Sequence, residues 1–318
     1  MNVFVLGAGA MGGLFGAKLR QAGHDVWLYD IWQEHVDRIA ERGLIVEDVD
    51  GTREVIPVPA SSTDPSPLAG ADLVIVEVKT YDTYNALTAV RKWLEPGTFV
   101  LSLQNGVGNL EEMRRALPDH DRIIIGTTAQ GSNVVEPGHV LRTGAGPTEI
   151  GDPRTEQELA ALEEIASAFT GAGIPMTVAP DVMPAVWAKL AANAAINPTT
   201  ALTGLRNGDL PSAPGMRDIY AAIVEELVAV MDALDIARIK GDYLAYAEFV
   251  MDVTATSYSS MLQDVRNRRR TEIDAINGAV ARFGAEAGVD TPVNRIITNL
   301  VLQRQRDYLE EGRGAFER

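Results

Sequence analysis

Residues 2–12 read NVFVLGAGAMG, and these residues are the most informative about the fold of the 318-residue chain. The apolar run from Asn2 to Leu6 predicts a buried strand, and Met11 to Ala22 predicts a helix closed by Gly23. Between them, Gly7 permits a tight turn, Gly9 lets the backbone approach a pyrophosphate and Gly12 lets helix and strand pack closely. In this context the motif predicts dinucleotide binding, and a glycine-rich packing turn is the alternative.

A second strand is predicted from Asp25 to Tyr29, and Asp30 ends it. In a dinucleotide-binding unit, an acidic residue at this place binds the ribose hydroxyls of the adenosine and repels a 2′-phosphate. The next residues, Ile31 and Trp32, are not basic. The sequence therefore favours NAD(H) over NADP(H), and the alternative is an aspartate that caps the helix from Gln33.

Further strand signals alternate with helix signals up to about residue 180. After a hairpin over Leu44–Val58, the predicted strands are Asp72–Val78, Thr98–Leu103, Arg122–Ala129 and Ile174–Val178. From Asp181 onward only amphipathic helices are predicted: Pro184–Ile196, Met216–Leu234, Gly241–Val253, Asp274–Ala287 and Pro292–Leu309. We predict an α/β fold, with a Rossmann-type parallel-sheet domain over residues 1–180 and an all-helical domain over 181–318.

The composition excludes several classes of function. The chain has no cysteine, which rules out disulfides and thiolate metal sites, and its four histidines show no metal-ligand spacing, so we predict no metal. A net charge of -16 argues against nucleic acid or an anionic membrane as a partner. No apolar run reaches the roughly 18 residues of a spanning helix, and the start lacks the basic region of a signal peptide. We expect a cytoplasmic protein.

Two polar residues follow core strands at the edge where parallel sheets bind ligands. Lys79 comes after the strand at Asp72–Val78, where it would reach the phosphates or the nicotinamide ribose. Asn105 follows the strand at Thr98–Leu103, where its amide would face the nicotinamide. The alternatives are a lysine that reaches solvent and an Asn-Gly tight turn.

A lysine and two asparagines recur every four residues in an alanine-rich helix. Lys189, Asn193 and Asn197 share one helix face, and such groups are costly to bury without partners, which a polar substrate would supply. A desolvated lysine can act as a proton donor. The alternative is a snorkelling lysine with two capping residues. Because Pro198 disfavours helical dihedrals at the residue before it, we expect the helix to end or kink at Asn197.

A run of hydroxyls, Ser257 to Ser260, and the segment from Arg268 to Asp274 also carry polar groups. The run and Glu272 offer hydrogen-bonding groups to a substrate carboxylate and hydroxyl. A solvated cluster of ion pairs is the other interpretation of the arginine-rich segment, and the spacing leaves both open.

Taken together, these segments resemble the ketopantoate reductases (2-dehydropantoate 2-reductases) over nearly the whole chain. The matching segments are Gly7–Gly12, Val78–Thr80, Gln104–Gly106, Trp187–Leu190, Asn193–Pro198, Ser260–Asp264 and Arg270–Gly278. The resemblance implies a Rossmann domain followed by a helical domain. It implies NADPH as the family default, whereas Asp30-Ile31-Trp32 stands here where well-known members carry a basic residue.

The resemblance also implies roles for individual residues. Lys189 resembles the catalytic lysine that protonates the alkoxide, and Glu272 its acidic partner, which holds the substrate hydroxyl and positions the lysine. The implied substrate-binding residues are Asn105, Asn193, Asn197, Asn207 and Ser260. The implied cofactor-binding residues are Gly7, Gly9, Ala10, Met11, Gly12, Asp30, Lys79 and Asn105.

The expected activity is hydride transfer from a reduced nicotinamide to the C2 carbonyl of ketopantoate, giving pantoate for pantothenate and coenzyme A synthesis. A related NAD-dependent 2-keto or 2-hydroxy acid dehydrogenase and a non-catalytic nucleotide-binding regulator are the alternatives. The long apolar helices of the second domain leave room for a homodimer.

Overall fold

The computed structural model describes residues 1–152 and 154–314, with 311–314 as backbone only. The chain forms two compact units. The first consists of Met1–Gln104 and Asn109–Val182, and the second of Asn105–Gly108 and the chain from Met183 onward. The short segment Asn105–Gly108 therefore belongs to the helical unit, although strand β7 (Phe99–Ser102) and helix α4 (Asn109–Ala116) of the first unit flank it in sequence.

The first unit is built on a mixed sheet, ten-stranded over the described residues, in the order β4-β3-β9-β8-β7-β6-β1-β2-β5, with β10 paired to β9. Its central strands, β8-β7-β6-β1-β2-β5, are all parallel, and the glycine motif directly follows β1. The predicted class, a parallel-rich Rossmann-type sheet followed by helices, is confirmed. The strands are β1 Asn2–Leu6, β2 Asp25–Tyr29, β3 Leu44–Glu47, β4 Arg53–Ile56, β5 Ala60–Ser61, β6 Leu73–Val76, β7 Phe99–Ser102, β8 Ile123–Glu136, β9 His139–Gly151 and β10 Met176–Ala179.

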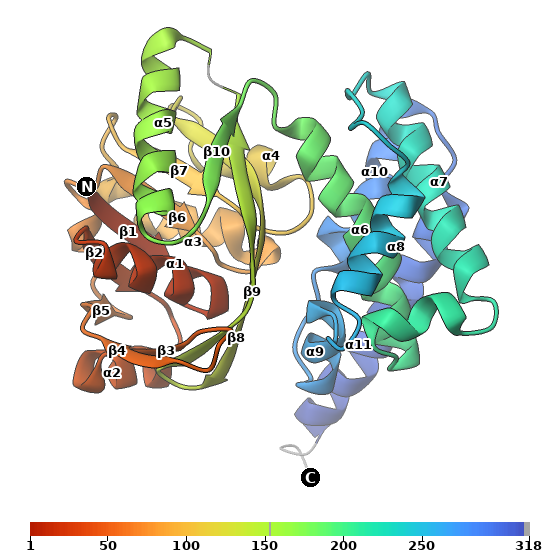
Figure 1. Ribbon diagram of the computed structural model, residues 1–318, viewed down its shortest axis with the longest axis horizontal. Helices are drawn as coiled ribbons and strands as arrows, with labels where there is room; N and C mark the ends of the chain where they lie inside the picture. Colours follow the sequence, from red (N-terminus) through yellow and green to blue (C-terminus); the bar gives the residue numbers. More distant parts are fainter. Residues whose placement is uncertain (153, 315–318) are drawn as a thin grey trace. The chain divides into compact units, whose positions relative to one another are not determined.

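Helices cover both faces of this sheet, as Figure 1 shows. Phe15 and Phe169, from α1 and α5, meet edge-on at 5.8 Å within one apolar core. Leu87 and Met113, from α3 and α4, belong to the core on the other face. The helices are α1 Ala10–Gln21, α2 Gln33–Arg42, α3 Thr83–Val90, α4 Asn109–Ala116 and α5 Glu156–Gly171, with short 3₁₀ turns η1 Ser66–Leu68, η2 Thr80–Asp82 and η3 Arg91–Trp93.

The strand predicted at Arg122–Ala129 is the first half of β8, but β8 continues to Glu136, and neither its antiparallel partner β9 nor the short β5 was predicted from the sequence. β9 has low strand propensity because it contains Gly144, Gly146 and a proline. Its glycines have a packing reason: a Cβ on Gly146 would lie 2.5 Å from the Cβ of Ala129 on β8. Close backbone approach therefore replaces side-chain patterning here.

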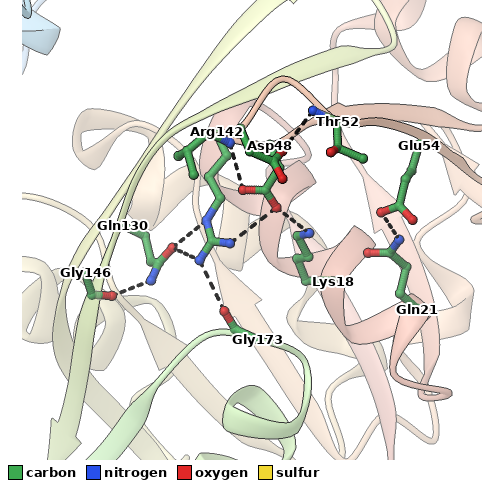
Figure 2. A network of polar contacts seen from close by, with 11 residues as sticks. Lys18, Gln21, Asp48, Thr52, Glu54, Gln130, Arg142, Gly146 and Gly173 are labelled. Carbon is green, nitrogen blue, oxygen red and sulfur yellow. Dashed lines mark hydrogen bonds and ion pairs between the residues drawn. The ribbon is translucent and has the colours of Figure 1, made fainter.

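A buried polar network fastens this hairpin to the rest of the unit (Figure 2). The Arg142 guanidinium donates to Gln130 Oε1 at 2.7 and 3.0 Å and lies 3.5 Å from Asp48 Oδ2. Lys18 of α1 pairs with the same Asp48 oxygen at 2.8 Å. Burial raises the pKa of Asp48, but the Lys18 hydrogen bond, the Val49 amide and the two positive charges outweigh it and hold the pKa below its ordinary value.

The second unit is helical and has its own apolar core, in which Trp187, Tyr220 and Val280 are fully or almost fully buried. Trp187 packs against Phe283 with ring centroids 5.9 Å apart. The helices are α6 Met183–Thr203, α7 Met216–Ala233, α8 Tyr243–Val253, α9 Ser260–Arg266, α10 Asn277–Ala287 and α11 Pro292–Gly314, with 3₁₀ turns η4 Asn207–Ser212 and η5 Ile273–Ala275.

Helix α6 corrects one prediction. It does not end at Asn197 but continues through Pro198 to Thr203. The hydroxyls of Thr199 and Thr200 donate to carbonyls of the preceding turn, Thr199 to Ala195 at 2.6 Å, which supplements the backbone bonds around the proline. The predicted helix at Asp274–Ala287 divides instead into η5 and α10, which places Asn277 at the start of α10.

Candidate active site

The glycine motif lies where three parallel strands end at one edge of the sheet. Leu6 of β1 is in register with Tyr29 of β2 and Val76 of β6. Gly7 follows with φ +99°, and its N–H donates to the Tyr29 carbonyl at 2.8 Å. A Cβ on Gly7 would lie 2.6 Å from the Val78 nitrogen, so this turn needs glycine for both its conformation and its packing.

The two other glycines of the motif differ in a way that matters for ligand binding. A Cβ on Gly12 would lie 1.9 Å from the Gly7 carbonyl oxygen, so Gly12 serves close packing. A Cβ on Gly9 would have no atom within 4 Å, and its φ of -62° is open to any residue. Packing among the described residues therefore does not require glycine at position 9, whereas a pyrophosphate against the backbone would.

The start of α1 suits a phosphate group. Gly9 is the N-cap and gives no side-chain hydrogen bond, and the first turn has no acidic residue. The first amides of a helix have no partners within it and carry the positive end of its dipole. The residues present, among them Ala10 and Met11, therefore fit the pyrophosphate of a dinucleotide.

We expect Gly9→Ala to lower nucleotide affinity without unfolding the protein. A methyl at this open position would crowd a pyrophosphate, at a cost of about 1–3 kcal/mol, typical of overpacking. Titration of the reduced cofactor by fluorescence and a thermal melt measure the two effects. Gly97→Ala, which is equally open but precedes β7 at its amino end, is the matched control. If wild type and Gly9→Ala bind the nucleotide with equal affinity, the pyrophosphate does not bind at this loop.

Asp30 directly follows β2 and is half-buried. Its Oδ1 accepts the Trp32 N–H at 2.9 Å. Trp32 is the N-cap residue of α2, and no side-chain hydrogen bond caps this helix. The alternative of a helix-capping aspartate therefore holds only in the looser sense that Asp30 fixes the turn before the helix. Ile31 is 83% exposed and supplies no charge for a 2′-phosphate.

His35 supports the glycine loop from α2, a role that its position in the sequence does not reveal. The fully buried ring accepts the Gly138 N–H on Nδ1 at 3.1 Å, and Nε2 lies 3.0 Å from the Ala8 carbonyl oxygen. These partners require the neutral tautomer with the proton on Nε2. Burial lowers the pKa of His35, although the Ala8 hydrogen bond and the Asp30 charge oppose the shift.

Gln104 fixes the strand edge next to Lys79. It is buried, and its amide donates to the Val78 carbonyl at 2.5 Å and to Thr83 Oγ1 at 2.9 Å. Ser102 donates to its Oε1 at 2.8 Å. The chain segment that holds Lys79, directly after β6, is therefore anchored to the end of β7.

The segment with Asn105 packs within the helical unit. Gly106 has φ +81°, and a Cβ there would lie 2.3 Å from the Ala275 carbonyl oxygen. The same oxygen accepts the Val107 N–H at 3.0 Å. Ala275 lies three residues after Glu272, so the structure brings the segments of Asn105 and Glu272 together.

Lys189, Asn193 and Asn197 all lie on the unbroken helix α6, at positions that share one face. Lys189 and Asn193 are half-buried, and Asn197 is 4% exposed. The rest of this part of α6 is apolar and packs into the core of the unit. The face is therefore a polar stripe on an otherwise buried helix.

Two of the predicted substrate-binding amides have atoms that no described residue satisfies. Asn193 Nδ2 is a buried donor and Asn207 Oδ1 a buried acceptor, and neither has a hydrogen-bond partner among the described residues. Asn207, at the start of η4, donates a hydrogen bond from its Nδ2 to Thr254 Oγ1 at 2.9 Å. Buried polar groups are usually paired, so these two atoms are available as hydrogen-bond partners for a polar ligand.

Ser260 and Glu272 are placed by contacts of their neighbours. Ser260 is the exposed first residue of α9, whose N-cap Ser259 lies 2.6 Å from Thr200 Oγ1 of α6. Glu272 is 8% exposed. The preceding Thr271 donates its N–H and hydroxyl to Gln305 Oε1 of α11, at 2.7 and 2.9 Å.

The described ranges, 1–152 and 154–314, contain neither a cluster of metal ligands nor a membrane-spanning helix. No group of three or more His, Asp or Glu residues there could hold a metal ion. No helix in that part of the chain has the length and apolar character to span a membrane.

Comparison with known proteins decides the family. The model "Ketopantoate reductase PanE/ApbA" matches residues 3–155, and "Ketopantoate reductase PanE/ApbA C terminal" matches residues 181–305. The chain belongs to the ketopantoate reductase family. The first match contains the glycine motif, Asp30 and Lys79, and the second contains Lys189 and Glu272, so both predicted sets of site residues lie within the matched regions.

Relatives and solved structures match this chain over nearly its full length. The 2-dehydropantoate 2-reductase of Halobacterium salinarum is 37% identical, over 96% of this chain and 100% of that one. A PanE/ApbA family ketopantoate reductase from Ralstonia eutropha superposes with a TM-score of 0.88 at 33% identity, over 97% and 100% of the chains. The structure of D-mandelate dehydrogenase with NADH and anilino(oxo)acetate superposes with a TM-score of 0.89 at 28% sequence identity, over 97% of this chain and 99% of that one.

Proposed function

We propose that this protein is a 2-dehydropantoate 2-reductase, which reduces the C2 carbonyl of ketopantoate to the hydroxyl of pantoate. The observation that carries the proposal is the polar face of α6, where Lys189 lies one turn before Asn193 and its unpartnered buried donor. Family membership supports it, as do the names of relatives that match nearly end to end.

The proposed cofactor site is formed by the glycine loop, Asp30 and Lys79. The reduced nicotinamide, when bound, supplies the hydride. The loop would hold the pyrophosphate through backbone amides, because the open position at Gly9 leaves room for it. The neutral His35 holds the Ala8 carbonyl and thereby the shape of the loop.

In the helical unit, we assign the proton transfer to Lys189. Its ammonium would stabilise the negative charge that develops on the C2 oxygen and then protonate it. Glu272 would hold the substrate hydroxyl and orient the lysine. Asn193, Asn197, Asn207, Ser260 and Asn105 would bind the keto acid, with the unsatisfied atoms of Asn193 and Asn207 as its hydrogen-bond partners.

A panel of 2-keto acids assayed with NADH and NADPH tests this function. Ketopantoate should be reduced, with oxidation of the cofactor matched by formation of pantoate. No turnover with any keto acid, together with tight binding of the nucleotide, would favour the non-catalytic regulator.

A second candidate is an NADH-dependent 2-keto acid or 2-hydroxy acid dehydrogenase of the same family. Asp30 favours it, and the similar D-mandelate dehydrogenase structure contains NADH. An aryl 2-keto acid in the panel separates the candidates: a kcat/KM above that for ketopantoate would replace the first proposal with the second. The homodimer and the cytoplasmic location expected from the sequence stay predictions.

We predict that NADH is the better reductant and that Asp30→Ala narrows the preference. Removing the carboxylate removes both the repulsion of a 2′-phosphate and a hydrogen-bond partner of the ribose hydroxyls. The ratio of kcat/KM for NADH to kcat/KM for NADPH should therefore fall about tenfold, or ~1.4 kcal/mol. Asp25→Ala, at the exposed amino end of the same strand, is the control. A wild type that prefers NADPH by about tenfold or more would contradict the role of Asp30.

A further inference from the structure

The proline within α6 leaves one backbone carbonyl without its usual partner. In an α-helix, the N–H of residue 198 would donate to the carbonyl of residue 194, four residues earlier. Pro198 has no N–H, so the helix itself offers no backbone donor to the Ala194 oxygen at that position. Ala194 is fully buried, so water does not replace the missing donor.

Asn277 supplies that donor from another helix. Its Nδ2 donates to the Ala194 carbonyl oxygen at 3.1 Å, and the residue is fully buried at the start of α10. The amide oxygen of Asn277 has no partner among the described residues. A buried, half-satisfied amide costs free energy, which indicates that the donor function is the reason for this residue type.

The Asn277 amide is itself held in place by a chain of buried polar contacts. It donates a second hydrogen bond to Asn294 Oδ1 of α11, at 3.0 Å. Asn294 Nδ2 donates to the Ile223 carbonyl and to Glu226 Oε2 of α7, at 3.1 and 2.8 Å. The Glu226 carboxylate also accepts the first N–H groups of α11, from Val293 and Asn294, at 2.8 and 2.9 Å. Four helices are thus linked to one carbonyl.

The location of this carbonyl gives the contact a functional meaning. Ala194 directly follows Asn193, precedes Asn197 by three residues and lies one turn and a residue after Lys189. A hydrogen bond to its carbonyl fixes the rotation of the helix turn from which the two amides project. We propose that Asn277 is a positioning residue, which sets the direction of the substrate-binding face of α6. This inference rests on the proposed function of that face.

The test exploits the missing N–H of the proline. Asn277→Ala removes the side-chain donor, and Pro198→Ala adds a backbone N–H that can donate to the same oxygen. We expect Asn277→Ala to raise KM for ketopantoate and lower kcat, by about tenfold each, with nucleotide affinity within about twofold of wild type. Adding Pro198→Ala should recover most of both losses, and Pro198→Ala alone should stay within about threefold of wild type.

Asn294→Ala is the matched control. It breaks the same buried network, at the α11 side, but leaves the Asn277 donor to Ala194 in place. Pro198→Ala should therefore not rescue Asn294→Ala. Equal rescue of both variants would mean that Pro198→Ala stabilises the fold in general, and it would overturn the positioning role. Asn277→Gln, with its amide one methylene further out, is the second variant if the alanine variant does not fold.

Hydrogen exchange gives a readout that does not depend on turnover. Asn277→Ala should speed amide exchange in the α6 peptide around Ala194, and Pro198→Ala should restore protection there. Unchanged exchange, or no recovery in the double variant, would overturn the inference even if the enzyme reduces ketopantoate. Restored protection in a protein that reduces no keto acid would overturn the proposed function and leave Asn277 as the residue that holds α6.

Discussion

Lys189→Ala is expected to lower kcat by about 10²–10⁴-fold, the usual effect of removing a positioned general acid. This corresponds to roughly 3–5 kcal/mol of activation free energy. The reduced ketone needs stabilisation and a proton at its C2 oxygen, and Lys189 is the only lysine between Lys92 and Lys240. Steady-state and single-turnover kinetics measure the loss.

Two further variants sharpen this prediction. Lys189→Arg keeps the positive charge but cannot release a proton, so it should restore part of the electrostatic stabilisation and little of the proton transfer. Lys240→Ala, at an exposed position of the helical unit, is the control and should leave kcat unchanged. A folded Lys189→Ala with turnover within about threefold of wild type would remove the lysine from the mechanism.

The pH dependence of activity is an independent test of Lys189 as the proton donor. A lysine acts as an acid only while it carries its proton, so wild-type activity should fall at high pH as the ammonium is lost. The falling limb should disappear in Lys189→Ala, whose residual activity has no such group to titrate. Persistence of the limb in the variant would assign it to another residue.

Asn193→Ala is expected to raise the dissociation constant of the keto acid by about 10–150-fold. Losing a buried hydrogen bond to a charged ligand costs roughly 1.5–3 kcal/mol. Asn193 Nδ2 has no partner among the described residues, so removing it leaves no other protein group without a hydrogen bond. Loss of this amide group should therefore not lower the melting temperature. Substrate titration at saturating cofactor and a thermal melt measure both quantities.

Ser260→Ala should weaken substrate binding in the same direction, while nucleotide binding stays nearly intact in both variants, because the proposed nucleotide-binding loop belongs to the other compact unit. Asn207→Ala is the informative contrast, since it also breaks the bond to Thr254 and should lower stability. A large loss of nucleotide affinity in Asn193→Ala or Ser260→Ala would assign these residues to the cofactor rather than to the keto acid.

Local sequence determined the features whose causes are local. Gly7 has the positive φ that a glycine-rich turn predicts, and Gly12 has the close contact that a side chain would prevent. The spacing of Lys189, Asn193 and Asn197 predicted a shared helix face, because the helical period depends only on the backbone. The order of strands and helices likewise predicted the two units' classes.

Other features depend on residues that lie far apart in the chain, and only the three-dimensional structure reveals them. Pro198 predicts an end or a kink of the helix from local dihedral preferences, yet α6 continues to Thr203, and Asn277 donates to the carbonyl that the proline leaves. His35 joins Ala8 to Gly138, a contact across more than a hundred residues. The pairing of β9 also depends on the space beside its glycines. Burial and pairing of polar groups are satisfied by whichever residue the fold brings close, so sequence spacing does not reveal them.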